Sequence, residues 1–137
     1  MKIEKTLNVP NPVFFDKIID SVIFDIRKAT GKTVSRKQLA GYEYVKEFSA
    51  SSRAKIKIEE VIENQVYQFR TETTKNEFVV RYELETINEK QTKVIYTETM
   101  KSFGILQQMN DMLLGTILGY FKRKQFKKML VMMEESY

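Results

Sequence analysis

Five consecutive segments of the chain alternate polar and apolar residues with a period of two, and this pattern constrains the fold more than any other feature. The segments begin at Tyr42, Lys55, Val66, Glu77 and Thr92. Alternation of this kind predicts strands with one buried face. Short turns separate the segments, so consecutive strands are expected to pair as antiparallel hairpins in a meander. Such a sheet has an apolar face that another element must cover.

The residues before this meander predict one more strand and a helix. Residues 2–9 alternate and predict the first strand. Asn11 is then placed to cap a helix, and Pro12 suits its first position. Apolar residues recur at a spacing of three to four up to Gly31, which is expected to end the helix in a left-handed conformation. A further helical turn is expected over residues 35–39.

The C-terminal part of the chain, residues 105–137, contains no proline and predicts a long helix of roughly 50 Å that covers the sheet. One apolar face of this helix is expected to look at the sheet. It carries Ile105, Met109, Met112, Thr116, Gly119, Phe126, Leu130 and Met133. Five cations crowd into residues 121–128, but Lys124, Lys127 and Lys128 point away from the apolar face. The favoured interpretation of this basic run is therefore the solvated side of an amphipathic helix.

The composition bounds the class of protein. A chain of 137 residues with 42% hydrophobic and 30% charged residues predicts one globular domain over residues 1–137. Cys and His are both absent, which disfavours disulfides, metal sites and the commonest catalytic sets, so we expect no cofactor. The net charge of +5 is spread thinly and gives little support to a nucleic-acid partner. No signal peptide is recognised, and ten uncharged residues over 112–121 are too few for a transmembrane segment, so we expect a cytoplasmic protein.

The stretch KIEKTLNVPNPVFFDKIID resembles the first strand and helix entry of the START-like, helix-grip superfamily (SRPBCC, polyketide cyclase-like). More narrowly, FFDKIIDSVIFDIRKATGK followed by LAGYEYVKEF is similar to a small family of unknown function from Gram-positive bacteria. The resemblance implies an α+β helix-grip fold. Its curved six-stranded antiparallel sheet would wrap around the long C-terminal helix, with one or two short helices between strands 1 and 2. It also implies a cavity between sheet and helix that takes apolar or amphipathic molecules, and it carries no catalytic residues onto this chain.

Strand parity predicts which side chains face inward, and tyrosines are frequent among them. The predicted inward residues are Tyr42, Tyr44, Phe48, Ile56, Ile58, Ile62, Tyr67, Phe69, Thr71, Phe78, Val80, Tyr82, Leu84, Val94, Tyr96 and Met100. Buried tyrosine hydroxyls need hydrogen-bond partners. A polar-tipped, aromatic-lined pocket would supply them. An ordinary core with tyrosines reaching its rim would do so equally well, and the sequence leaves both interpretations open.

The same parity turns Lys5, Lys46 and Glu98 inward. Buried charges are rare unless they are paired. A Lys–Glu pair inside the pocket would bind a ligand head group or exchange protons. The alternative is that these residues sit near strand ends, where their side chains reach water.

These observations favour non-catalytic binding of a small apolar or amphipathic molecule between the sheet and the C-terminal helix. Gly119 would leave room in the helix, and methionines would make a pliable wall. The candidate cavity residues are Tyr44, Phe48, Phe69, Thr71, Val80, Tyr82, Tyr96, Glu98, Met109, Met112, Thr116 and Gly119. The alternative is a dimerisation or partner-binding module with no open cavity, and a third hypothesis is a peripheral lipid-binding protein. Enzyme activity is disfavoured, because it would have to rely on Tyr, Lys or Glu alone.

Overall fold

The computed structural model describes residues 1–49, 52–102, 127–128, 130–132 and 134–135. Its elements are, in chain order, β1 (Lys2–Leu7), α1 (Asn11–Thr30), the 3-10 helix η1 (Arg36–Gln38), β2 (Glu43–Ser49), β3 (Ser52–Ile62), β4 (Val66–Glu72), β5 (Asn76–Asn88) and β6 (Gln91–Ser102). The α+β class and the number of strands expected from the sequence are confirmed.

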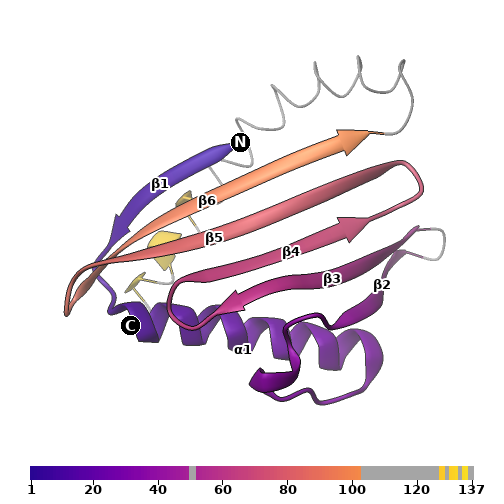
Figure 1. The fold of residues 1–137 in the computed structure, drawn as a ribbon, viewed down its shortest axis with the longest axis horizontal. Helices are drawn as coiled ribbons and strands as arrows, with labels where there is room; N and C mark the ends of the chain where they lie inside the picture. Colours follow the sequence, from indigo (N-terminus) through magenta and orange to yellow (C-terminus); the bar gives the residue numbers. More distant parts are fainter. Residues whose placement is uncertain (50–51, 103–126, 129, 133, 136–137) are drawn as a thin grey trace.

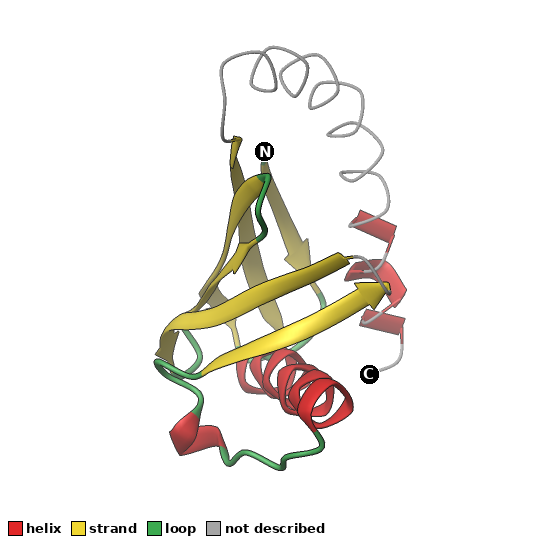
Figure 2. Cartoon of the chain, turned by 90° about the vertical axis from the view of Figure 1, so that its right-hand side faces the viewer, coloured by secondary structure: helices red, strands yellow, loops and turns green. Residues whose placement is uncertain are grey.

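The strands form one antiparallel sheet in the order β1-β6-β5-β4-β3-β2, and the predicted meander from β2 to β6 is confirmed. Figure 1 shows α1 along one face of this sheet, and Figure 2 shows how strongly the sheet bends around that side. Strand β1 pairs with β6 at one edge, although α1 and four strands separate them along the chain. Strands β1 and β2 lie at opposite edges of the sheet, and α1 lies between them in the chain and crosses one face of the sheet.

Helix α1 forms where the sequence predicted it and ends as expected. Gly31 adopts φ 75°, and its backbone N–H donates to the Arg27 carbonyl oxygen at 2.8 Å. Glycine adopts this left-handed conformation without the steric cost that a side chain brings. The N-cap position belongs to Pro10, and no side chain caps the helix, so the expected capping role of Asn11 was wrong. With 20 residues, α1 is also longer than the short helix predicted between the first two strands.

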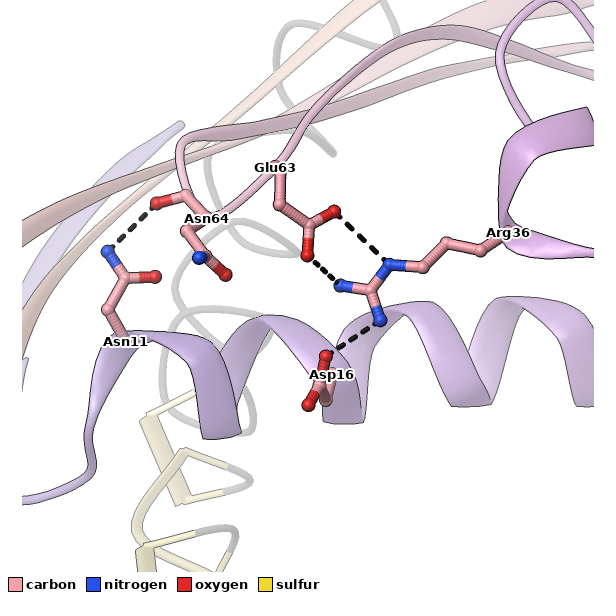
Figure 3. Close-up of polar contacts among 5 residues, drawn as sticks. All are labelled: Asn11, Asp16, Arg36, Glu63 and Asn64. Carbon is pink, nitrogen blue, oxygen red and sulfur yellow. Dashed lines mark hydrogen bonds and ion pairs between the residues drawn. The ribbon is translucent and has the colours of Figure 1, made fainter.

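The Asn11 side chain instead fastens the start of α1 to the sheet (Figure 3). Its Nδ2 atom donates to the Asn64 carbonyl oxygen at 2.8 Å. The same atom also donates to the Thr86 hydroxyl at 3.0 Å. Nearby, the Arg36 guanidinium of η1 forms ion pairs with Glu63 at 2.6 Å and with Asp16 of α1 at 2.7 Å. Contacts between residues far apart in the sequence thus hold α1, η1 and the β3–β4 turn together.

Among the elements that the structure describes, α1 is the helix that covers the inner face of the sheet. Its buried residues are Asn11, Phe14, Phe15, Ile18, Ile19 and Ile26. The sequence pattern predicted this role for a long helix over residues 105–137, most of which lie outside the described residues. Residues 127–128, 130–132 and 134–135 have helical backbone. Among them, Leu130 is fully buried in the core, and the Glu134 carboxylate accepts hydrogen bonds from the backbone N–H and side chain of Asn8.

One predicted inward residue, Ile62, faces outward. The pairing of β3 with β4 shifts between Ile58 and Glu60, which marks a β-bulge. A bulge adds one residue to a strand and reverses its parity beyond that point. Ile62 is consequently exposed, and Val61 packs against the core in its place. Met100 pairs in register with Phe78 and shares its inward parity, although it is 41% exposed near the end of β6.

Candidate functional site

A cavity of about 510 Å³ lies between α1 and the inner face of β2–β5. Its lining residues are Phe14, Ile18, Ser21, Val22, Asp25, Tyr44, Lys46, Ile56, Tyr67, Phe69, Thr71 and Tyr82. Most of this surface is apolar or aromatic, and the charges are confined to Asp25 and Lys46. This volume lies within the range of roughly 300–1,000 Å³ that small-molecule sites occupy.

Local periodicity explains how each wall is built. The contribution of α1 comes from Phe14, Ile18, Ser21, Val22 and Asp25, which follow one another at helical spacing. On the sheet, Tyr44 of β2 pairs in register with Ile56 of β3, which pairs in turn with Thr71 of β4. These strand residues therefore form one row across the sheet, facing the stripe on α1.

The Asp25 carboxylate joins the helix wall to the strand wall. Its Oδ2 atom accepts a hydrogen bond from the Tyr44 hydroxyl at 2.6 Å. Its Oδ1 atom lies 2.6 Å from the Lys46 Nζ atom, which makes a charge-assisted hydrogen bond. The side chains of Asp25 and Lys46 retain exposed fractions of 28% and 35%, so this end of the cavity reaches solvent.

The surroundings fix the protonation of these groups. Burial raises the pKa of Asp25, but hydrogen bonds from Lys46 and Tyr44 outweigh it and bring the pKa below its ordinary value. Burial and the Asp25 hydrogen bond raise the pKa of the Tyr44 hydroxyl. Burial is also the main cause of the raised pKa of Tyr67. At neutral pH, the polar end therefore combines an ionised carboxylate with protonated phenols.

Tyrosines on three neighbouring strands extend the aromatic wall. Tyr67, Tyr82 and Tyr96 pair in register across β4, β5 and β6. The Tyr67 and Tyr82 ring centroids are 6.2 Å apart, and Tyr82 meets Tyr96 edge to face at 5.1 Å. Burial, followed by the charge of Glu98, raises the pKa of Tyr82 to about 12. Edge-to-face contacts of this kind stabilise an aromatic cluster beyond the area that it buries.

The candidate residues fall into three groups. Tyr44, Phe69, Thr71 and Tyr82 line the cavity. Val80 and Tyr96 lie in a second buried cluster with Ile3, and the Glu98 carboxylate accepts a hydrogen bond from the Tyr96 hydroxyl at 3.1 Å. The third group lies outside the described residues and consists of Met109, Met112, Thr116 and Gly119. Phe48 joins this group because its side chain is not described.

Lys46 has a carboxylate partner that strand parity did not reveal. Parity suggested Glu98, but Lys46 and Glu98 lie on β2 and β6, with three strands between them. Lys46 forms its ion pair with Asp25 of α1. Lys5 of β1 is partly buried and pairs in register with Val94, four residues before Glu98. The place of Asp25 on the cavity side of α1 could have been predicted, since it continues the spacing of Ile18, Ser21 and Val22, but its pairing with Lys46 could not.

The described residues offer neither a metal site nor a membrane span. No group of three or more Asp and Glu side chains within the described ranges is placed to hold a metal ion. No helix among the same residues is long and apolar enough to span a membrane.

The fold and site define an α+β protein in which a curved antiparallel sheet and a helix enclose a mostly apolar cavity with one charged end. The chain belongs to the family described as "Domain of unknown function (DUF3284)", whose model matches residues 1–119. The narrower expectation of a family of unknown function is thereby confirmed, and its Gram-positive origin stays a prediction. No sequence among the curated proteins matches the chain.

Solved structures resemble this chain over most of its length. Protein Mll3558 from Rhizobium loti aligns with a TM-score of 0.59 at 19% identity, covering 96% of this chain and 94% of that one. The Aha1 dimer from Colwellia psychrerythraea gives 0.56 at 13% identity, covering 99% and 93%. The Zhui aromatase/cyclase from Streptomyces sp. R1128 gives 0.51 at 10% identity, covering 77% and 68%. At such identities the likeness shows the fold alone, and this fold is consistent with the helix-grip superfamily expected from the sequence.

Proposed function

We propose that the protein binds a small apolar or amphipathic molecule in the cavity between α1 and the sheet, without changing it chemically. The observation that carries this proposal is the cavity of about 510 Å³, with apolar and aromatic walls and a few polar groups gathered at one end. Sites for small molecules have this composition, because apolar walls supply affinity and a few polar groups fix orientation. Tyr44, Phe69, Thr71 and Tyr82 are the predicted contacts that line it.

The protonation of the polar end supports binding rather than catalysis. General acid–base catalysis works best when the pKa of the catalytic group lies near the working pH. The pKa of Asp25 is lowered, and the pKa values of Tyr44 and Tyr67 are raised, so all three move away from neutrality. Such groups hold a bound molecule by hydrogen bonds without exchanging protons with it.

The test combines retained ligand with a cavity-filling variant. Native mass spectrometry of the purified protein would reveal a co-purified molecule as a mass increment that is lost on denaturation. The neutral fluorophore 1-aminoanthracene then serves as a probe for titration of the wild type and of Thr71→Phe, whose new ring would enter the cavity from β4. A matched control is Thr99→Phe, because Thr99 is exposed on β6.

We expect Thr71→Phe to weaken probe binding by about tenfold while the fold survives, because the ring occupies space that the probe needs. The control variant should bind the probe as the wild type does. Equal binding by the wild type and Thr71→Phe, or no binding by the wild type, would refute the proposal. Substitutions at Met109, Met112, Thr116 and Gly119 extend the same test to the predicted helical wall.

A partner-binding or dimerisation module is the second candidate. Phe24 of α1 is 67% exposed, and an exposed aromatic side chain of this size favours a contact with another protein. The similar protein from Colwellia psychrerythraea is named as a dimer. Light scattering on the wild type and on Phe24→Ser tests this candidate, which requires a dimer that the substitution weakens. The hypothesis of peripheral lipid binding stays a prediction, as does the cytoplasmic location.

A further inference from the structure

One polar group in the cavity is not used by the fold. Tyr67 is 4% exposed, and its ring packs against Phe69 at 5.6 Å and against Tyr82 at 6.2 Å. Among the described residues, its hydroxyl has no hydrogen-bond partner. Tyr67 is also one of the residues that line the cavity, so a molecule bound there lies against this side chain.

The cavity lining also contains an ion pair, formed by Asp25 and Lys46. Asp25 lies close enough to Tyr67 for its charge to act on the Tyr67 hydroxyl. The same carboxylate holds Lys46 at 2.6 Å, so the lining residues that the structure describes carry one anion and one cation, already matched. Each carboxylate oxygen accepts one hydrogen bond from Tyr44 or Lys46 and keeps a lone pair for another donor.

This arrangement discriminates among head groups. A carboxylate or sulfate would have to take Lys46 from Asp25 and would be repelled by the Asp25 charge. An ammonium group would be attracted by the Asp25 carboxylate, but the Lys46 ammonium already lies against this carboxylate and would repel it. A neutral hydroxyl meets neither cost, since it can donate to Asp25 and accept from the Tyr67 hydroxyl.

We propose that Asp25 and Tyr67 make this end of the cavity selective for an uncharged hydroxyl group, so that the cavity takes an alcohol or phenol in preference to its carboxylate analogue. The inference rests on the proposed function, because it requires that the cavity bind a small molecule. It assigns two specificity-determining residues, Asp25 and Tyr67, that are not among the cavity candidates chosen from the sequence. It also predicts that the preference reverses when the Asp25 charge is removed.

In the experiment, the wild-type protein is titrated with 2-naphthol and with 2-naphthoate at pH 7, and calorimetry measures the affinity for each probe. The two probes share one ring system, but the first is neutral and the second ionised at this pH. We expect the wild type to bind 2-naphthol about tenfold more tightly, since rejection of a mismatched charge is a strong source of specificity. In Asp25→Asn, the Lys46 ammonium no longer faces a carboxylate at this position and can pair with an anionic ligand, so 2-naphthoate should become the tighter ligand.

Two further variants separate the roles. Tyr67→Phe should weaken 2-naphthol binding by about 2–10-fold, the equivalent of one hydrogen bond, and leave 2-naphthoate unaffected. The control is Tyr42→Phe, which removes a hydroxyl from a ring 6.2 Å from Tyr44 that does not line the cavity. Lys46→Gln removes the ion-pair partner of Asp25 and should exclude 2-naphthoate more strongly, so this variant tests the charge even where Asp25→Asn fails to fold.

Equal or tighter binding of 2-naphthoate by the wild type would overturn this inference and leave cavity binding intact. The same conclusion follows if neither naphthalene probe binds while 1-aminoanthracene does. If none of the three probes binds, both the inference and the proposed function fail. An unchanged preference in both Asp25→Asn and Lys46→Gln would remove the assigned role of the charge pair.

Discussion

The two faces of the sheet both carry ion pairs, but they use them differently. On the outer face, the Arg81 guanidinium contacts Glu60 at 2.8 Å and Glu83 at 2.6 Å, and it also donates to Gln68. Arg70 similarly contacts both Glu59 and Glu77. On the inner face, Asp25 is the single carboxylate among the described lining residues of the cavity. An outer cation therefore keeps a partner when one carboxylate is lost, whereas Lys46 and Tyr44 share Asp25.

The difference teaches that the number of ion pairs does not reveal what they do. The outer pairs and the inner pair are exposed to a similar degree, since the side chains of Arg81 and Glu60 are 33% and 38% exposed and those of Lys46 and Asp25 are 35% and 28% exposed. Water therefore screens the charges on both faces, and the ion pairs themselves contribute little. The inner face differs because Asp25 also accepts a hydrogen bond from the hydroxyl of the buried Tyr44, and this hydroxyl loses its acceptor when Asp25 is removed. We therefore expect the ion pairs of Arg70 and Arg81 on the outer face to tolerate substitution, and we expect Asp25 and Lys46 on the inner face to affect both stability and ligand choice.

The largest expected effect comes from the apolar packing that surrounds the cavity. Ile58 of β3 is fully buried, and Ile58→Ala should lower the free energy of unfolding by about 2–5 kcal/mol through lost burial and a new void. The adjacent Lys57 is exposed, and Lys57→Ala should change it by less than about 0.5 kcal/mol. Urea unfolding measures both, and similar effects at the two positions would contradict the assignment of faces.

The next effect concerns the inner pair itself. Asp25→Ala removes the acceptor for the Tyr44 hydroxyl and the ion-pair partner of Lys46. Because Tyr44 is buried, we expect a loss of about 1–3 kcal/mol in the free energy of unfolding. Asp25→Ala in a Tyr44→Phe background should cost less, since no phenol is then left without a partner. Equal costs in the two backgrounds would show that the Tyr44 hydroxyl does not depend on Asp25.

A smaller effect is expected on the outer face. Glu60→Ala leaves Arg81 with Glu83 and Gln68, so the loss should stay below about 1 kcal/mol. Raising the salt concentration should shrink it further, because the pair is partly exposed. A loss as large as that of Asp25→Ala would remove the contrast between the two faces. Urea unfolding at low and high salt provides the measurement.

These contrasts also show which parts of the fold were predictable. The strands, their meander and the end of α1 at Gly31 follow from periodicity and turn residues, which are local signals. The inward parity of Ile62 failed because the bulge before Glu60 shifts the register. A signal was present, since Glu59 and Glu60 are consecutive charged residues that interrupt the alternation.

The site was harder to predict than the fold because its polar end depends on a contact between distant elements. Parity placed Lys46 on the inner face, but no local pattern shows which carboxylate meets it. Asp25 lies 21 residues away on α1, and it reaches Lys46 only when the helix lies across the sheet. Asn11 shows the same limit, because its side chain binds the β3–β4 turn rather than the start of its own helix.

The smallest expected effect is the pH dependence of the inner pair. The pKa of Asp25 lies below its ordinary value of 3.8 in the folded protein, so the folded state holds this proton less tightly than the unfolded state. A depressed carboxyl pKa contributes stability that is fully present above the unfolded pKa and is lost as pH falls through the folded pKa. The contribution of Asp25 should therefore be constant near pH 7 and decline below about pH 4.

The measurement compares the urea unfolding of the wild type and Asp25→Asn at pH 7 and at pH 3. Other carboxyl groups titrate in both proteins, so the difference between them isolates Asp25. We expect the advantage of the wild type at pH 7 to narrow at pH 3, because protonation removes the charge that holds Lys46. Glu59→Gln on the outer face gives the matched comparison. Burial raises the pKa of Glu59, but hydrogen bonds from Gln68 and Arg70 outweigh it and bring the pKa below its ordinary value of 4.5. Its contribution should begin to decline at a higher pH than that of Asp25, because its unfolded pKa is higher. A difference between the wild type and Asp25→Asn that stays constant from pH 7 to pH 3 would show that the charge of Asp25 does not stabilise the inner face.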